Sequence, residues 1–182
     1  MSLCVKCAQH ERTCCQVGEV LITDGDIQRI AAHTRRSDFW SYVVPADPDL
    51  VQPQPHDPNW LPYTLRPNGT RAHLHRQTSG DCTFLTAAGC SLPTAVRPLI
   101  CRLYPFDYTE QGITGTVSGC PLYLLEKGQT LIEGIGMKPA DAERWRQQLY
   151  HELRTGRVYD ENRHRALSQM TPNEASQVPE IT

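Results

Sequence analysis

Eight cysteines restrict the folds that are open to this chain. Four of them lie in the stretch CVKCAQHERTCC, which spans residues 4–15, and the other four lie between residues 82 and 120. Any fold must place this sulfur where its chemistry is satisfied, by metal, by disulfide or by burial. The full set is Cys4, Cys7, Cys14, Cys15, Cys82, Cys90, Cys101 and Cys120.

Composition favours metal ligands over disulfides and over buried or redox-active thiols. Cysteine makes up 8 of 182 residues, below the roughly 8–10% of short secreted disulfide scaffolds. Residues 1–20 contain no secretory apolar stretch, and the apolar runs are too short to span a membrane. We therefore expect a cytoplasmic chain with no membrane contact, where reducing conditions disfavour disulfides. An even number of cysteines still leaves a framework of four disulfides as an alternative.

Spacing supports metal binding. The C-x-x-C pair Cys4 and Cys7 can direct both sulfurs at one zinc ion, about 2.3 Å away, or at iron in an iron–sulfur cluster. Neighbouring side chains of an extended segment point in opposite directions. We therefore expect the adjacent Cys14 and Cys15 to serve two metals or different irons of one cluster. The alternative is that one of the two is a buried structural thiol.

The charged residues give no sign of a nucleic-acid partner, but some of them lie close to the cysteines in the sequence. The net charge is -2 and the pI about 6.4, with no strongly basic segment, so we expect no nucleic-acid binding. Thiolate sites are negatively charged, and nearby cations can stabilise them. The cations within a few residues of a cysteine are Lys6, Arg12, Arg97 and Arg102.

Two histidines, His73 and His75, alternate along a predicted strand and would share one of its faces. With eight cysteines available, a soft metal does not need imidazole ligands. We therefore expect these histidines on an exposed strand face rather than in a metal site.

The hydrophobic pattern predicts a small single domain of the α+β class, organised around cysteine metal sites. Its boundaries are residues 1–156, with a Pro-rich loop or insertion at about 45–67 and a polar C-terminal tail at 157–182. Thr23 caps one predicted helix, Gly156 ends another, and Trp60 anchors the loop. The predicted helices are 23–34, 37–44, 94–101 and 139–156; the predicted strands are 18–23, 63–65 paired with 71–77, 82–85, 104–108 and 112–118.

The motifs together resemble the YkgJ-type cysteine-cluster family, also known as CxxCxxxxCC zinc- or iron-chelating domains. They comprise C-x-x-C, a C-C pair, L-x-x-x-x-D-I-x-R-I-A, C-x-F-L and R-P-x-x-C-R-x-Y-P-F, from Cys4 to about Cys120. The resemblance implies that all eight cysteines are metal ligands. It also places Arg97, Pro98, Arg102 and Pro105 in the family signature. The gap from Cys7 to Cys14 holds six residues where the family name has four, and the Pro-rich stretch is a further departure.

Three functions fit the sequence. The first is a protein that binds zinc, iron or an iron–sulfur cluster for a structural, metal-handling or electron-transfer role. The second is an iron- or iron–sulfur-dependent enzyme related to the flagellin lysine N-methylases, which carry similar cysteine clusters. The third is an interaction module held together by zinc. No Walker, Rossmann or G-x-S-x-G motif is present, so the sequence identifies no catalytic or organic cofactor-binding residue and no protein partner.

Overall fold

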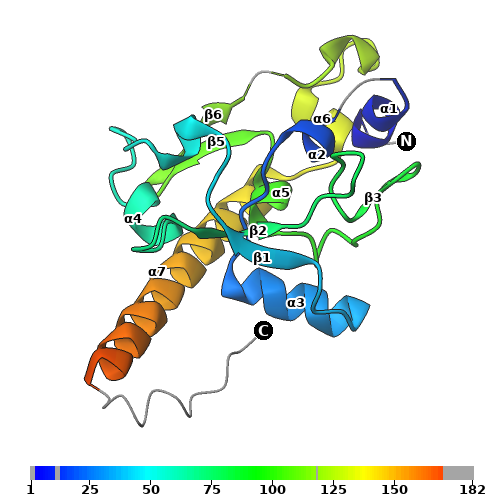
Figure 1. Ribbon diagram of the computed structural model, residues 1–182. Helices are drawn as coiled ribbons and strands as arrows, with labels where there is room; N and C mark the ends of the chain where they lie inside the picture. The colour runs from blue at the N-terminus through cyan, green and yellow to red at the C-terminus, as the bar shows by residue number, and fades with distance from the viewer. Residues whose placement is uncertain (1–2, 11–12, 118, 170–182) are drawn as a thin grey trace.

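The computed structural model describes residues 3–10, 13–117 and 119–169, with side chains through residue 156 (Figure 1). Within these residues the chain forms helices and three two-stranded antiparallel sheets, which confirms the α+β expectation. The helices are α1 (Leu3–His10), α2 (Cys14–Val17), α3 (Asp24–Thr34), α4 (Trp60–Thr64), α5 (Leu99–Leu103), α6 (Leu131–Ile135) and α7 (Pro139–Gln169), with 3-10 turns η1 (Pro48–Val51) and η2 (Leu122–Leu124).

The strands form three antiparallel pairs. They are β1 (Trp40–Val43) with β2 (Arg71–Leu74), β3 (Leu85–Thr86) with β4 (Gly89–Cys90), and β5 (Phe106–Thr109) with β6 (Gly112–Thr116). The expected strand 18–23 is reduced to one bridge between Leu21 and His73. Flanking hydrogen bonds still hold that segment along the second edge of β2, from Ile22 N to the Ala72 carbonyl (3.0 Å) and from Leu74 N to the Val20 carbonyl (3.0 Å).

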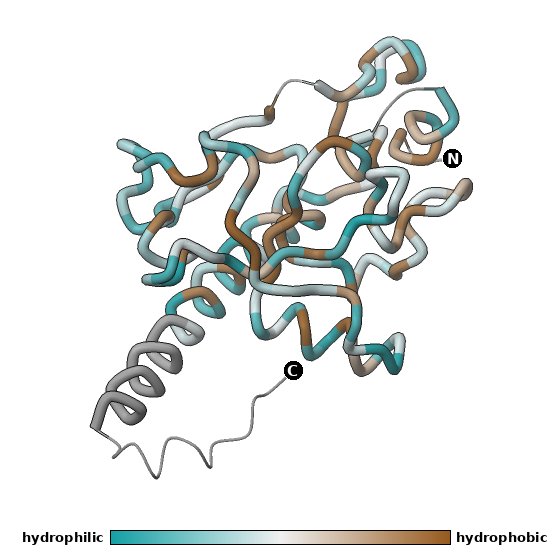
Figure 2. Tube along the Cα trace, viewed as in Figure 1, coloured by the Kyte–Doolittle hydropathy of each residue, from teal (hydrophilic) through white to brown (hydrophobic). Residues whose placement is uncertain are grey.

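Two hydrophobic clusters form the interior. One gathers Leu99 and Leu103 of α5 against Leu149 and Tyr150 of α7, and it includes the buried Trp60. The loop anchor predicted at Trp60 is thereby confirmed. The other cluster packs α3 and the β1–β2 pair against the segment around residues 82–92. Figure 2 shows hydrophobic stretches through the middle of the molecule and hydrophilic ones on the outer loops.

Helix α7 continues past Gly156 to Gln169, so the predicted helix end was wrong. A glycine inside a helix costs only about 0.5–1 kcal/mol relative to alanine, which a long helix tolerates. A Cβ on Gly156 would lie 3.4 Å from Asp24 Oδ2, an ordinary van der Waals distance, so the packing does not require glycine here. Residues 170–182 of the predicted tail lie outside the described part, and the division at residue 156 stays a prediction.

Three further expectations were wrong in detail. Residues 37–44 contain strand β1 rather than a helix, and β1, not residues 63–65, pairs with β2. The aromatic and β-branched residues of β1 favour a pleated surface. The helix predicted from Thr94 begins only after Pro98, its N-cap residue, because proline disfavours helical geometry in the residue before it. The helix 23–34 is confirmed, with Thr23 Oγ1 accepting from Asp26 N at 3.0 Å.

No helix in the described part of the chain is long and apolar enough to cross a membrane.

Candidate metal centre

All eight cysteines lie in the described residues, and all carry free thiols. Figure 1 shows that α1, α2 and the β3 segment, which carry or adjoin most of them, lie on one side of the molecule. Across the described residues, no three His, Cys, Asp or Glu side chains are placed to hold one ion. The thiols instead form two loose groups of four, called neighbourhoods below, and the thiols of a group would have to turn toward a common point to bind a metal.

One neighbourhood lies in the interior and contains Cys15, Cys82, Cys90 and Cys101. The N–H of Cys82 donates to the carbonyl of Cys15 at 2.8 Å. Cys82 belongs to the second hydrophobic cluster, against which Cys15 and Cys90 pack. Burial, together with the nearby Cys15 and Cys90, raises the pKa of the Cys82 thiol to about 11.

Cys101 joins this neighbourhood from α5. Burial raises the pKa of its thiol well above the ordinary value, as do the adjacent Cys15, Cys82 and Cys90. Desolvation has the largest effect on this pKa. A thiol so placed stays protonated until something replaces the proton. A bound metal ion would do so.

A buried carboxylate fixes the start of α5, two residues before Cys101. Asp26 is fully buried, and its Oδ1 accepts from Leu99 N at 3.0 Å. The same oxygen accepts from Arg29 Nη2 at 2.6 Å, while Oδ2 accepts from Thr23 N at 3.1 Å. Arg29 also pairs with Glu152 of α7 at 2.6 Å. This network ties α3, α5 and α7 together around the interior thiols.

The second neighbourhood lies nearer the surface and contains Cys4, Cys7, Cys14 and Cys120. Cys4 and Cys7 are three residues apart on α1, on neighbouring positions of one helix face. Helix α1 contacts η2, which begins two residues after Cys120. The Lys6 ammonium donates to the Leu124 carbonyl at 3.3 Å and holds these elements together.

Electrostatic interactions connect the members of this second neighbourhood. Burial raises the pKa of the Cys4 thiol, and Cys120, Cys7 and Cys15 act in the same direction while Arg97 opposes them. Burial also raises the pKa of Tyr104 to about 12, with contributions from Cys120, Cys14 and Cys7. The Tyr104 hydroxyl and the Cys120 thiol are hydrogen-bonded.

The expectation that Cys14 and Cys15 point in opposite directions was wrong in its premise. They lie in the short helix α2 rather than in an extended segment, where successive side chains diverge by about 100°. Their thiols are hydrogen-bonded to each other, and this bond, followed by burial, strongly raises the pKa of Cys15. The two neighbourhoods therefore adjoin at this pair.

Of the four cations expected near the thiols, Arg97 has the clearest role. Its charge opposes the rise in the pKa of Cys4 and Cys90, which burial causes, and in that of Cys15, which the hydrogen bond with Cys14 and burial cause. One guanidinium thus serves both neighbourhoods, and its Nε donates to the Leu92 carbonyl at 2.9 Å. Arg102 is buried on α5, and burial lowers its pKa. Arg12 lies outside the described residues.

The prediction that the two histidines lie on an exposed strand face was wrong. His73 is 5% exposed, with Nδ1 3.3 Å from Glu19 Oε2. Burial and the charge of Arg71 lower its pKa to about 4, so it is neutral near pH 7. The half-buried His75 contacts the Asp38 carbonyl (2.9 Å) and Ser41 Oγ (3.0 Å).

Sequence reasoning missed two residues that the structure brings to the thiols. Asp26 lies in the predicted helix 23–34, but its contact with Leu99 of α5 depends on tertiary packing that the sequence does not signal. Tyr104 belongs to the R-P-x-x-C-R-x-Y-P-F motif, so the motif was a signal for it. Its contact with Cys120 joins positions that spacing alone cannot pair.

Comparison with known families finds one match. Residues 3–121 match the CxxCxxCC family, described as a "Putative zinc- or iron-chelating domain". The matched segment contains all eight cysteines. No match was found among curated proteins or among solved structures.

Proposed function

Because the chain belongs to the CxxCxxCC family of zinc- or iron-chelating domains, we propose that its eight cysteines are the ligands and form two adjoining four-thiolate sites. We call them the surface site and the interior site. The surface site comprises Cys4, Cys7, Cys14 and Cys120; the interior site comprises Cys15, Cys82, Cys90 and Cys101.

The observation that carries this proposal is the arrangement around Cys15. Its carbonyl accepts the Cys82 N–H at 2.8 Å, which draws the first cysteine cluster of the sequence onto the second. Cys15 and Cys90 then pack on the hydrophobic cluster that contains Cys82. Cys14, its neighbour in α2, interacts instead with Tyr104, the hydrogen-bond partner of Cys120. These contacts support a division at the Cys14–Cys15 pair.

The chemistry of the thiols fits a zinc or iron ligand set. Burial raises the pKa of Cys4, Cys82, Cys90 and Cys101, so the metal-free thiols hold their protons. A metal that replaces those protons stabilises the folded chain directly, and its affinity rises with pH. Arg97 would offset part of the negative charge that four thiolates give each site.

The role that this arrangement supports is a structural, metal-handling or electron-transfer one. The interior site would join α2, the β3–β4 pair and α5, and the surface site would join α1 to the segment before η2. These elements are short, and the β3–β4 pair has only two residues in each strand. Metal bonds would therefore supply stability that such elements cannot supply alone. The sites would bind zinc, iron or iron–sulfur clusters, because thiolate ligands suit all three.

Serine substitutions test the division into two sites. Cys14→Ser should remove the metal of the surface site, and Cys15→Ser that of the interior site. Adding Cys4→Ser to Cys14→Ser should remove no further metal, whereas the combination of Cys14→Ser with Cys15→Ser should remove both. Metal per chain is measured by elemental analysis, with Thr83→Ser beside Cys82 as a matched control. A double substitution at Cys14 and Cys15 that loses no more metal than either single one would contradict the proposal.

A further inference from the structure

A hydroxyl and an imidazole are hydrogen-bonded on one face of the β1–β2 sheet. Ser41 of β1 is paired in register with His73, and His75 follows two residues later, so these side chains leave the same face of the sheet. Ser41 Oγ lies 3.0 Å from His75 Nε2. A nucleophilic hydroxyl and its general base are typically about 2.6–3.2 Å apart. The pair therefore has the spacing of a nucleophile and a base.

A third group fixes the orientation of the imidazole. His75 Nδ1 lies 2.9 Å from the backbone carbonyl of Asp38, which can only accept a hydrogen bond. Nδ1 therefore carries the proton, Nε2 of the neutral ring is an acceptor, and the Ser41 hydroxyl donates to it. The Asp38 carboxylate accepts from Arg36 Nε at 2.9 Å, so the carbonyl orients the ring. Nucleophile, base and orienting acceptor thus follow the order found in serine hydrolases.

Ser41 and His75 both line a cavity of about 270 Å³, and neither residue is fully buried. The volume is just below the range of about 300–1,000 Å³ for small-molecule sites, so the cavity suits a small group. Val43, Val44 and Ala46 contribute apolar walls. No cysteine is among the described residues that line this cavity, so it is separate from both proposed metal sites.

Arg76 also lines the cavity and gives it a positive charge. Its guanidinium is held by three backbone carbonyls, those of Gly80 (2.7 Å), Gln16 (2.6 Å) and Gly18. Glu19 is the carboxylate among the described lining residues, and it accepts from a backbone N–H at 2.9 Å. A fixed cation beside the pair favours a substrate whose carbonyl oxygen becomes negative during attack.

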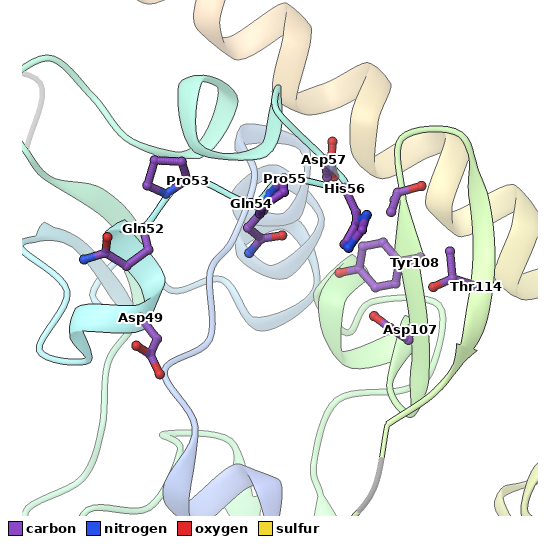
Figure 3. A pocket seen from close by; sticks show the side chains of 11 residues that line it. Asp49, Gln52, Pro53, Gln54, Pro55, His56, Asp57, Asp107, Tyr108 and Thr114 are labelled. Atoms are coloured by element: carbon purple, nitrogen blue, oxygen red, sulfur yellow. The ribbon is translucent and has the colours of Figure 1, made fainter.

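A larger cavity, of about 430 Å³, lies between the Pro-rich segment and the β5–β6 hairpin (Figure 3). His56 lines it together with Asp57 and Tyr108. No serine or cysteine is among the described residues of its wall. The larger cavity therefore offers its histidine no serine partner, and it supplies a control for the pair at Ser41.

We propose that Ser41 and His75 form a hydrolytic site for small carboxylic esters. Ser41 Oγ bonds to the ester carbonyl carbon while its proton passes to His75 Nε2. The bond from that carbon to the alcohol oxygen then breaks, and the departing alcohol takes the proton from Nε2. Water next gives a proton to Nε2 as its oxygen bonds to the acyl carbon. The bond to Ser41 Oγ breaks, Oγ takes the proton back, and the carboxylic acid leaves.

The same geometry selects the kind of ester. A carboxylate that orients the base stabilises the imidazolium, and its removal from a catalytic triad costs about 10⁴ in rate. The neutral carbonyl of Asp38 takes that place here, so we expect cleavage of esters with a good leaving group rather than of amides. The cavity volume restricts the acyl chain to a few carbons. This proposal does not depend on metal binding by the cysteines.

Hydrolysis of two 4-nitrophenyl esters by the full chain tests the proposal. The acetate is the small acyl probe and the decanoate the large one; nitrophenolate is followed by absorbance, and the rate in buffer is subtracted. The acetate should be cleaved, and the decanoate about tenfold more slowly or less. Ser41→Ala and His75→Gln should each lower the acetate rate about a hundredfold.

Labelling with diisopropyl fluorophosphate identifies the nucleophile directly. Ser41 Oγ bonds to phosphorus, fluoride leaves, and the hydroxyl proton passes to His75. Mass spectrometry of the digested chain should find the label on Ser41. His75→Gln should slow labelling in the same proportion as ester hydrolysis, which a merely structural histidine would not do.

Control variants make the result specific. Ser37→Ala removes an exposed serine that does not line the cavity, and His56→Gln removes the imidazole of the larger cavity; both should keep the acetate rate. Cys14→Ser should also keep it, which separates this proposal from thiol chemistry and from the metal sites. If Ser41→Ala does not fold, the mapped label and His75→Gln still decide. A label only on other residues, an unchanged acetate rate in Ser41→Ala or His75→Gln, or absence of both hydrolysis and labelling would overturn the proposal.

Discussion

Removal of the Asp26 carboxylate should destabilise the chain strongly, because three elements depend on it. In Asp26→Ala, the Thr23 and Leu99 N–H groups lose acceptors at 3.1 Å and 3.0 Å. Arg29 loses a partner at 2.6 Å but keeps Glu152 at 2.6 Å. Removing one partner of a buried charged pair costs about 3–5 kcal/mol. Because Arg29 stays paired and because burial raises the pKa of Asp26, we take the lower end, about 3 kcal/mol.

This cost can be measured as a melting temperature. For a domain of this size, each kcal/mol corresponds to about 2–4 °C, so Asp26→Ala should melt roughly 6–12 °C lower. Asp26→Asn should show about half of that change, because one amide oxygen can still accept from Leu99 while the amide nitrogen faces Thr23 N. Asp38→Asn is the control, since its carboxylate is exposed. Thermal unfolding followed by circular dichroism gives both values.

A second readout connects this network to the proposed interior site. Since Leu99 begins the helix that carries Cys101, Asp26→Ala should also reduce the metal bound by the interior site while the surface site keeps its metal. Melting of Asp26→Ala within about 2 °C of the unaltered chain would refute the reasoning. So would equal effects of alanine and asparagine, because the account assigns the cost to individual donors.

Three other perturbations follow from the packing. The pKa of His73 falls from 6.5 to about 4 on folding, so on acidification the unfolded chain binds the proton before the folded chain does. The free energy of unfolding should therefore fall by about 3 kcal/mol as the pH drops from about 6.5 to about 4. Urea titrations at several pH values should lose this pH dependence in His73→Asn but keep it in His75→Asn. Trp60→Ala should cost about 3–5 kcal/mol in the same assay, because the indole is 9% exposed in the first hydrophobic cluster. Gly156→Ala should be neutral or stabilising by up to about 1 kcal/mol, since α7 is helical there; a loss of stability would indicate that the helix ends at that residue.

Local signals in the sequence predicted those parts of the fold that are decided locally. The Thr23 cap marked the start of α3, and the strands predicted at 104–108 and 112–118 correspond closely to β5 and β6. Where neighbours far along the chain decide, prediction failed. Residues 40–43 read as helix but pair with β2, because Phe39 and the faces of β1 pack against elements that no local window contains.

The candidate site shows the same limit. The family resemblance implied all eight cysteines as ligands, which stays a prediction, and the C-x-x-C pair that spacing singled out lies on one face of α1. Spacing could not pair Cys15 with Cys82, because that contact is made by backbone atoms of distant segments. Nor could it find the reach of Asp26 to α5. The adjacency of Cys14 and Cys15 was informative, although the extended geometry assumed for it was not observed.

Metal and sulfide analysis on a single anaerobically purified sample, combined with its visible spectrum, tests the central claim most directly. The account predicts bound metal that fills two sites in each chain. Two zinc ions would give a colourless protein, and iron–sulfur clusters would give a brown protein with matching iron and sulfide that dithionite bleaches. A chain that carries no zinc or iron and whose thiols are blocked as disulfides would contradict it.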